Sequence, residues 1–250
     1  MSIHQLISAI DDPAHRIVST DLFDTVLLRD ASVQDGRLAE ACRRGAAIVG
    51  VDPAVLTRLR WSVHSSAYRA VAVERPEGDA SLAAIWATIA TSLGLEDAAV
   101  QTLRDIEVDT DIDHLTANRP LLSVLERAAA SGKRVVAVSD TYYSAGDLHR
   151  ILGKVVGRSP LHAVYSSSDL GSTKHAGGMF ARVAELEQTP TSSMLHLGDS
   201  WHADVAMARA AGCTAVHLPR AGSRRRMLGK AANRARLLLA TVRSGRTGTA

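Results

Sequence analysis

The sequence predicts an α/β fold with a central parallel sheet and an inserted all-helical cap domain. After residue 116, four short apolar segments alternate with helical segments, and the connections between them are short. This alternation is typical of a parallel sheet wound with right-handed crossovers. A further apolar segment lies near residue 17, and the stretch that separates it from the four repeats shows only helical spacing. We therefore expect a helical segment inserted into one α/β unit.

The N-terminal part is predicted to contain one helix and one strand. Residues 2–10 have amphipathic spacing, and Asp11-Asp12-Pro13 ends the helix. In residues 16–29, RIVSTDLFDTVLLR, an apolar run leads directly to Asp21. Apolar and β-branched residues that end abruptly in a carboxylate are typical of a buried parallel strand. Because ligands of open α/β sheets bind beyond the carboxyl ends of the strands, we expect Asp21 at the edge of a crevice.

The stretch between residues 32 and 116 is predicted to be entirely helical. Alanine, leucine and arginine recur there at helical spacing, with breaks at 51–53, 75–79 and Gly94. The helix that follows Ser81 has a clear apolar face, and residues 96–115 form another helix. We expect a small bundle with its own core. The predicted organisation is a core of residues 1–30 and 117–222, a helical cap of residues 31–116, and a basic C-terminal helix and tail of residues 223–250.

The four repeats follow the insertion in regular order. The predicted strands cover residues 134–140, 163–168, 194–200 and 214–219, and the predicted helices cover residues 121–131, 144–153, 176–187 and a segment that starts at Asp204. Polar residues stand at the ends of the first three of these strands, as they do after the strand that leads to Asp21. We therefore expect these polar groups to meet at one edge of the sheet.

The composition excludes several classes of protein. Hydrophobic residues make up 46% of the 250 residues and charged residues 22%, which is ordinary for a soluble domain. No apolar run reaches the length of a membrane span, and the first residues do not resemble a secretory leader. Cys42 and Cys213 form neither a disulfide framework nor a metal-binding spacing, so we expect them to pack as small side chains. A cytoplasmic location fits these features.

The positive charge is concentrated at the C-terminal end. Eight Lys and Arg residues and no acidic residue follow residue 220, so the net charge of +3 leaves −5 for the first 220 residues. Residues 223–243 are predicted to form a helix that packs on the acidic remainder of the protein or docks a protein partner. Nucleic acid or an anionic membrane is the alternative, but no aromatic residues are interleaved with the arginines.

The polar strand ends suit Mg²⁺-assisted phosphoryl transfer on a small phosphorylated substrate. They carry Asp21 and Asp24, Ser139 and Asp140, Lys174, and Asp199 and Asp204. Carboxylates on neighbouring strands can hold a hard cation, and a serine hydroxyl and a lysine can neutralise phosphate oxygens. Asp21 could then attack phosphorus in line and form an aspartyl phosphate that water hydrolyses.

Four motifs resemble, in order, those of the haloacid dehalogenase-like superfamily of hydrolases. They are Asp21-Leu22-Phe23-Asp24-Thr25, Val138-Ser139-Asp140, Lys174, and Gly198-Asp199-Ser200 with Asp204. The resemblance covers about residues 15–28 and 119–219 and implies a Rossmann-like three-layer core with a helical cap between the first two motifs. The flanking residues are similar to a poorly characterised bacterial subgroup. The resemblance also implies roles for single residues. It makes Asp21 the nucleophile, Thr25, Ser139, Asp140 and Lys174 the phosphate-binding residues, and Asp21, the Phe23 carbonyl, Asp199 and Asp204 the Mg²⁺ ligands.

One position departs from the pattern of the superfamily's phosphatases. They carry a general acid two residues after the nucleophile, where this chain has Phe23, and Asp24 lies one residue further on. Dehalogenases of this type lack that acid, but they do not keep the metal-binding acids that are present here as Asp199 and Asp204. Phosphonate hydrolases use a cap lysine, and this chain has no lysine before Lys133. We expect a Mg²⁺-dependent phosphohydrolase. The alternatives are a metal-independent dehalogenase and a catalytically impaired ligand-binding module.

Several other side chains are candidates for the missing acid or for the pocket. Asp24, His175 beside Lys174, and His202 in the metal loop are the candidate acids. Glu107 and Asp111 are more readily explained as part of a solvated helix face than as groups that face the crevice. Tyr142 and Tyr143 fit either a pocket lining or core packing. The cap offers only generic side chains, so the sequence does not identify the substrate.

Overall fold

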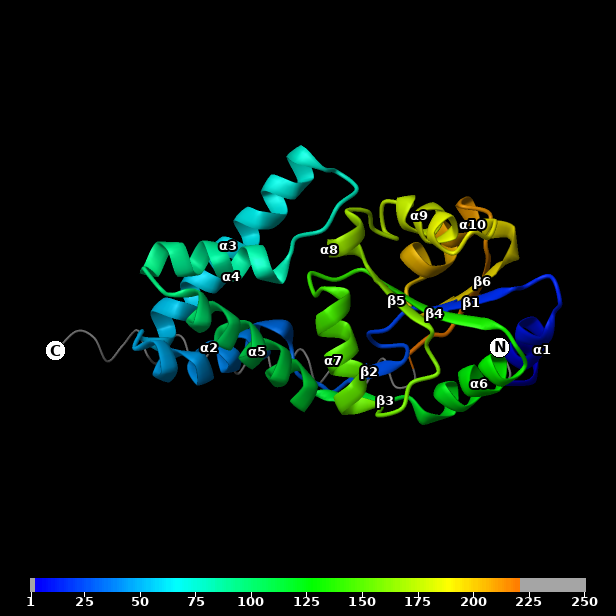
Figure 1. Ribbon diagram of the computed structural model, residues 1–250, viewed down its shortest axis with the longest axis horizontal. Coiled ribbons are helices and arrows are strands. Elements are labelled where there is room, and N and C mark those ends of the chain that lie inside the picture. Colours follow the sequence, from blue (N-terminus) through cyan, green and yellow to red (C-terminus); the bar gives the residue numbers. More distant parts are fainter. Residues whose placement is uncertain (1–2, 221–250) are drawn as a thin grey trace.

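The computed structural model describes residues 3–220 and contains a five-stranded parallel sheet (Figure 1). The strand order is β5-β4-β1-β6-β7, so the first strand lies in the middle. The bounds are β1 Ile17–Thr20, β4 Arg134–Ser139, β5 Ala163–Ser166, β6 Met194–Gly198 and β7 Thr214–His217. The predicted α/β fold is confirmed, and the central place of β1 puts its carboxyl end between those of β4 and β6.

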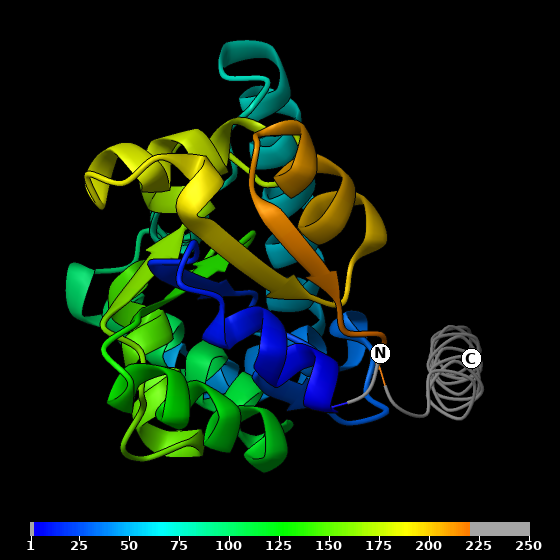
Figure 2. The same cartoon turned by 90° about the vertical axis from the view of Figure 1, so that its right-hand side faces the viewer.

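Helices cover both faces of the sheet (Figure 2). On one face lie α1 (Ile3–Asp11), α6 (Arg119–Ala130) and α7 (Ala145–Val155); on the other lie α9 (Gly178–Leu186) and α10 (Met207–Ala210). Neighbouring residues of β1 point to opposite faces, so Val18 packs with the first group and Ile17 with the second. Both faces are therefore apolar, as a fully covered parallel sheet requires.

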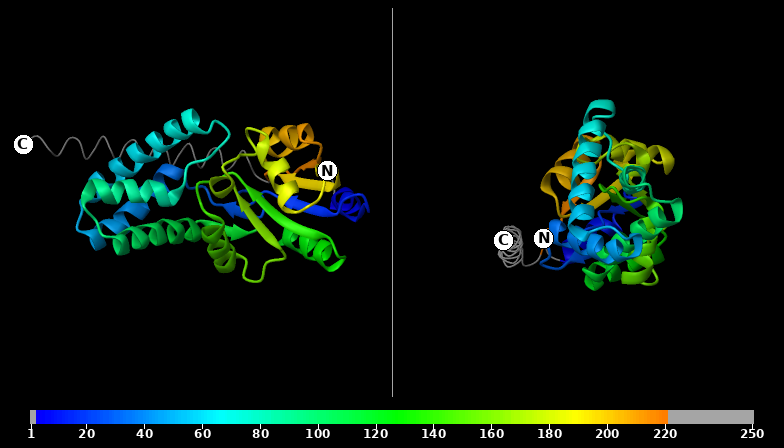
Figure 3. Two further views of the ribbon diagram at one scale, coloured as in Figure 1. Left: turned by 45° about the horizontal axis from the view of Figure 1, so that its top comes forward. Right: turned by 90° about the vertical axis from the view of Figure 1, so that its left-hand side faces the viewer.

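The cap is a bundle of four helices between two very short strands. The strands β2 (Leu27–Arg29) and β3 (Leu115–Ala117) pair antiparallel where the chain enters and leaves the cap. The helices are α2 (Gln34–Val49), α3 (Pro53–Glu74), α4 (Leu82–Leu93) and α5 (Asp97–Asp113), and they gather at one end of the molecule (Figure 3). The sequence analysis did not predict the β2–β3 ladder, because three-residue strands carry too little pattern.

The helix boundaries in the cap follow from local chemistry. Asp52 accepts hydrogen bonds from the backbone N–H groups of Ala54 and Val55, and Pro53 occupies the first turn of α3. Gly50 and Gly94 end α2 and α4 with φ angles of 67° and 65°, a conformation that glycine adopts at little cost. The predicted breaks at 51–53 and at Gly94 therefore coincide with helix ends.

A buried ion pair lies in the core of the cap. Arg60 and Glu107 are 0% and 2% exposed, and two hydrogen bonds of 2.6 and 2.9 Å join them. The indole N–H of Trp86 also donates to Glu107, at 2.8 Å. The expectation of a solvated face for Glu107 is therefore wrong. Glu107 lies on a helix with many polar residues, but it is buried because its partner Arg60 comes from α3. The sequence around Glu107 does not reveal this partner.

The cap contacts the core along two edges besides the β2–β3 hinge. The connection between α3 and α4, residues 75–81, which we call the strap, lies against the core: the Thr173 N–H donates to the Glu77 carbonyl at 2.7 Å. Next to the strap, the Leu82 N–H donates to the Tyr142 carbonyl at 2.8 Å. At the other edge, Arg150 of α7 pairs with Asp105 and Asp109 of α5. The cap is thus held over the carboxyl end of the sheet.

The basic helix predicted for residues 223–243 lies outside the described residues. Among the residues that are described, no helix combines the length and hydrophobicity needed to cross a bilayer.

Candidate functional site

The site lies at the carboxyl ends of the three central strands. Asp21 directly follows β1, and its backbone N–H donates to the Leu197 carbonyl of β6 at 2.8 Å. This hydrogen bond continues the β1–β6 ladder by one residue, so the backbone of Asp21 is fixed by the sheet itself. Asp21 is buried, with 8% of the residue exposed. A short carboxylate held in this way has little freedom, which suits a reacting group.

Three carboxylates gather around this position. Asp199 follows β6, and Asp204 lies in the π-helical turn η2 (Trp201–Ala206). Oxygen atoms of Asp21, Asp199 and Asp204 all lie within 4.8 Å of one another. A π-helical turn is rare and is often found at functional sites. Gly198 permits the close approach, because a Cβ atom at this position would collide with the Asp204 carboxyl group. This set of hard oxygen donors fits Mg²⁺.

Lys174 joins two of these carboxylates. Its Nζ lies 2.6 Å from Asp21 Oδ1 and 2.6 Å from Asp204 Oδ1, and the side chain is buried. Burial alone would lower the pKa of Lys174, but the charges of Asp21 and Asp204 outweigh burial and raise it. The ammonium group therefore stays protonated. It balances only one of the three negative charges.

The pKa shifts of the three carboxyl groups reflect this excess of negative charge. Burial raises the pKa of Asp21, and the charge of Asp204 raises it further against the effect of Lys174. Burial and the charge of Asp204 also raise the pKa of Asp199. Asp204 is the exception: burial raises its pKa, but a hydrogen bond from His196 and the charge of Lys174 outweigh this and lower it. The positive charge near Asp21 and Asp199 is therefore too small to offset their burial and the charge of Asp204.

Two buried hydroxyl groups, predicted to bind phosphate, have no hydrogen-bond partner in the described part of the chain. Neither Thr25 Oγ1 nor Ser139 Oγ has a hydrogen-bond partner within residues 3–220. Both side chains are buried, at 2% and 1% exposure. Buried polar atoms without partners are rare in folded proteins, and at a strand-end crevice they indicate groups kept for a ligand. Thr25 and Ser139 are the predicted phosphate-binding hydroxyls.

A comparison with protein families decides the classification. A family model described as haloacid dehalogenase-like hydrolase matches residues 16–212. The chain belongs to the haloacid dehalogenase-like hydrolase family. The family predicted from the four motifs is therefore confirmed, and the similarity to one bacterial subgroup stays a prediction. Hydrolases of this family act on small molecules and commonly use Mg²⁺.

Solved structures of this family show the same fold. A 2-haloacid dehalogenase from Pseudomonas syringae pv. Tomato DC3000 matches with 19% identity over 81% of this chain and 86% of that chain, at a TM-score of 0.57. A family enzyme from Bacteroides thetaiotaomicron in complex with magnesium and inorganic phosphate matches with 12% identity over 83% and 96%, at a TM-score of 0.53. A search of curated proteins found no match. The structural likeness covers both dehalogenases and other family enzymes, and at these identities it shows the fold alone.

Asp140 differs from the family-based prediction of phosphate binding. Its Oδ1 accepts the Lys174 N–H at 2.7 Å and its Oδ2 accepts the His175 N–H at 3.0 Å. Both oxygens are thus turned toward the backbone that carries Lys174. This argues that Asp140 positions the segment of Lys174 and does not itself contact phosphate.

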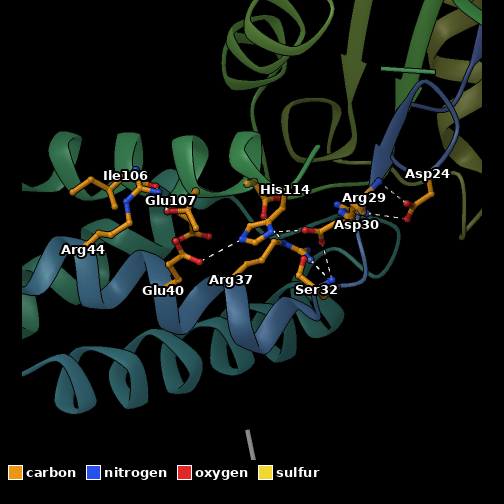
Figure 4. A network of polar contacts seen from close by, with 12 residues as sticks. Asp24, Arg29, Asp30, Ser32, Arg37, Glu40, Arg44, Ile106, Glu107 and His114 are labelled. Carbon is orange, nitrogen blue, oxygen red and sulfur yellow. Dashed lines mark hydrogen bonds and ion pairs between the residues drawn. The ribbon is translucent and has the colours of Figure 1, made fainter. Parts of the chain in front are cut away.

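Asp24 is also occupied elsewhere. It has a φ angle of 70°, and it pairs with Arg29 at 3.3 Å and with Arg220. Figure 4 shows Asp24 turned toward Arg29, next to the hinge contacts of His114 with Asp30 and Glu40. A carboxylate between two guanidinium groups is held in its charged form and is a poor proton donor. The structure therefore argues against Asp24 as the general acid.

Phe23 fills its position with an aromatic ring. The Arg29 guanidinium lies 4.1 Å from the ring centroid, and the Tyr143 ring lies 6.1 Å away. Arg29 and Tyr143 also line a cavity of about 300 Å³ between cap and core. The cavity is lined further by Gln34, Arg37, Tyr68, Asp79, Asp111, Asp140, Thr141 and Tyr142. The place where the acid normally stands therefore adjoins this cap–core cavity.

The structure places the other candidates for the pocket and for the missing acid. Tyr142 and Tyr143 line the cavity and also pack with the hydrophobic core, so both of their interpretations apply. Asp111 lines it as well and pairs with Arg37 at 2.6 Å, so the expectation of a solvated position is wrong. The rings of His175 and His202 contact each other at a tilt, with 4.5 Å between their centroids; both residues are exposed, and neither lines the cavity.

Sequence reasoning missed two residues at the site. His196, in the middle of β6, is fully buried and contacts Asp204 at 3.2 Å through Nε2. In the sequence, His196 stands inside the apolar run MLHLGDS, a position at which a histidine is expected only to pack. Asp79, in the strap, lines the cavity. Nothing in the sequence indicates its role beyond the break at residues 75–79, because its core partner Ser167 is 88 residues away.

Proposed function

We propose that this chain is a Mg²⁺-dependent phosphohydrolase that cleaves a small phosphorylated metabolite through an aspartyl-phosphate intermediate. The observation that supports it most is the group formed by Asp21, Asp199 and Asp204 around the single ammonium of Lys174. Three buried or half-buried carboxylates with one cation leave an excess of negative charge that a divalent cation would offset. This arrangement supports a metal-dependent enzyme over a metal-independent one.

The chemistry follows from the positions of the residues. Asp21 attacks phosphorus, and the bond to the leaving oxygen breaks with its electron pair on that oxygen. The hydroxyls of Thr25 and Ser139 and the ammonium of Lys174 donate to the phosphoryl oxygens as charge develops on them. Water then cleaves the aspartyl phosphate and restores the Asp21 carboxylate.

Mg²⁺ would be held by Asp21, Asp199, Asp204 and the Phe23 carbonyl, and it supplies charge neutralisation for the phosphoryl group. Asp204 is suited to this task because its lowered pKa keeps it ionised. The leaving group would lie in the cavity between cap and core, which opens next to Phe23 and Asp140.

The nucleophile can be tested directly. Asp21→Asn is expected to lower turnover of phosphate esters and acyl phosphates by a factor on the order of 10⁴ or more, because an amide cannot form the covalent intermediate. The measurement is phosphate release with Mg²⁺, together with trapping of the phosphorylated enzyme. Asp113→Asn, a change at an exposed cap residue, is the matched control. Equal turnover by wild type and Asp21→Asn would contradict the assignment.

A second candidate function is a metal-independent dehalogenase, which Phe23 favours because dehalogenases lack the second acid. Here Asp21 would attack carbon and displace halide. Halide release from 2-haloacids that persists in excess chelator would favour this function over the first. Binding of a phosphorylated ligand without turnover across a broad panel would instead indicate an impaired binding module, and a trapped aspartyl phosphate would exclude that module.

A further inference from the structure

The reaction proposed above needs a proton donor that the first motif does not provide. An alkoxide is a poor leaving group, and general acid catalysis contributes about 10²–10⁴-fold. Phe23 has no proton to give, and Asp24 is paired with Arg29 and Arg220. A donor must therefore come from another part of the cavity that adjoins Phe23, or the enzyme is limited to good leaving groups.

The cavity contains three carboxyl groups, and two of them are engaged. Asp140 accepts two backbone N–H groups at the Lys174 segment. Asp111 forms a buried ion pair with Arg37. Asp79 differs from Asp111 because its hydrogen bonds within the described chain come from neutral groups, the Ala80 N–H at 2.8 Å and the Ser167 hydroxyl at 2.7 Å. It differs from Asp140 because one of its donors is a side-chain hydroxyl that can rotate, whereas both oxygens of Asp140 are held by backbone N–H groups.

The strap brings Asp79 to the predicted phosphate-binding loop. Ser167 Oγ donates to Asp79 Oδ2 and accepts the Thr141 N–H at 2.8 Å, and Thr141 lies two residues after Ser139. A single hydroxyl therefore joins the cap carboxyl group to the core segment that contains Ser139. The Glu77–Thr173 backbone hydrogen bond fixes the strap next to Lys174 as well. Asp79 therefore lies beside the segments that contain the predicted phosphate-binding residues Ser139 and Lys174.

The surroundings of Asp79 allow both protonation states. The Ser167 hydroxyl has two acceptors, Asp79 Oδ2 and the Thr141 carbonyl at 3.2 Å, so it can turn to the carbonyl when Asp79 carries a proton. Burial raises the pKa of Asp79, the hydroxyls of Ser167 and Tyr68 and the Ala80 N–H partly offset this, and the nearby charge of Asp140 raises it again. The tyrosines of the cavity are weaker donors, since burial raises the pKa of Tyr142 and Tyr143 above an already high value.

We propose that Asp79, supplied by the cap, is the general acid and base that replaces the missing acid of the first motif. As Asp21 attacks phosphorus and the P–O bond breaks, the leaving oxygen takes the proton of the Asp79 carboxyl group and departs as an alcohol. In the second step the Asp79 carboxylate takes a proton from the attacking water, the bond between phosphorus and Asp21 breaks, and phosphate is released. Asp79 is then protonated again and Asp21 is again a carboxylate.

This inference rests on the proposed phosphohydrolase activity. The dependence of kcat/KM on the leaving group tests the role of Asp79 separately from that activity. Asp79→Asn removes the proton but keeps the shape. It is expected to lower kcat/KM for alkyl phosphates by a factor on the order of 100 or more, and to leave kcat/KM for acetyl phosphate and p-nitrophenyl phosphate nearly unchanged. The ratio kcat/KM is the correct measure, because it ends at departure of the leaving group. Retained activity on the activated substrates also shows that the variant is folded.

The control is Glu77→Gln, the same chemical change two residues away in the strap at an exposed side chain that does not line the cavity. It is expected to behave as wild type on both substrate classes. An equal loss on all leaving groups in Asp79→Asn, or no loss on any, would overturn the assignment of Asp79. Absence of phosphate release and of a trapped phosphoenzyme in the wild type would instead overturn the proposed function.

Discussion

At the scale of single residues, the site is supported by a buried chain of polar contacts beneath it. Ser19 of β1 lies opposite His196 of β6 in the sheet, and Ser19 Oγ is 2.9 Å from His196 Nδ1. His196 Nε2 contacts Asp204 Oδ1 at 3.2 Å, and Asp204 contacts Lys174. Burial lowers the pKa of His196, which keeps the ring neutral. Every contact is satisfied when Ser19 donates to Nδ1 and Nε2–H donates to Asp204, so His196 orients a predicted metal ligand.

Replacing His196 should therefore change metal binding. His196→Leu is expected to weaken Mn²⁺ binding about 10–100-fold, the usual cost of losing such an orienting partner. His196→Gln, whose amide N–H can replace Nε2–H, should restore much of the affinity. Isothermal titration with Mn²⁺ measures the binding without any assay of turnover. Phe180→Leu, which alters the ring packed at 4.8 Å on His196 but not its hydrogen bonds, is the control. Equal Mn²⁺ affinity in wild type and His196→Leu would contradict the role.

Residues of the site differed in how well the sequence predicted them. Asp21, Ser139 and Asp199 were predicted because each lies at or just beyond a strand end, where polar groups have few packing roles. Lys174 lies in the connection between α8 and α9 and was predicted from the resemblance of the motifs. His196 and Asp79 were missed for opposite reasons. The first is hidden in an apolar strand, and the second lies in a loop whose partner Ser167 is 88 residues away in sequence. Contacts between distant segments leave no local pattern.

At the scale of elements, the cap shows how much a helical pattern leaves open. The spacing predicted helices, and Asp52, Gly50 and Gly94 located their ends. The pattern did not predict how α3, α4 and α5 pack around the Arg60–Glu107 pair, because a buried charged residue resembles a surface residue in sequence. The Glu107 carboxylate accepts from both Arg60 and Trp86, so three helices depend on one side chain.

Breaking this ion pair should destabilise the cap strongly. Arg60→Met leaves the Glu107 carboxylate buried without its cation, which is expected to cost about 3–5 kcal/mol. Arg44→Met removes a more exposed pair with Asp113 and should cost about 1 kcal/mol or less. Urea unfolding followed by circular dichroism compares the two variants. Similar costs for both would show that the Arg60–Glu107 pair is no more important than an exposed one.

At the scale of the whole molecule, access to the site depends on the cap. The cap is held at the β2–β3 hinge, at the strap and along α5, where Arg150 pairs with Asp105 and Asp109 and Arg104 pairs with Asp147 at 3.5 Å. The strap is hydrogen-bonded to the core next to Lys174, and its Asp79 lines the cavity. Docking of the cap on the core therefore both covers the cavity and places Asp79 in its wall. Substrate entry then requires the strap and the α5–α7 edge to separate while the hinge stays intact.

This opening can be measured at two amides that are hydrogen-bonded only across the cap–core boundary. They are the N–H groups of Thr173 and Leu82, which donate to Glu77 and Tyr142. In a variant with Arg104→Gln and Arg150→Gln, each lost exposed pair removes about 0.2–1 kcal/mol, so hydrogen exchange at these amides should rise by a factor on the order of ten. The Asp21 N–H, which is bonded within the core, should exchange at an unchanged rate. Arg182→Gln, which breaks an exposed pair on α9, is the control. Faster exchange at Asp21 as well would indicate global loosening, whereas unchanged exchange at Thr173 and Leu82 would show that the α5–α7 pairs do not hold the cap closed.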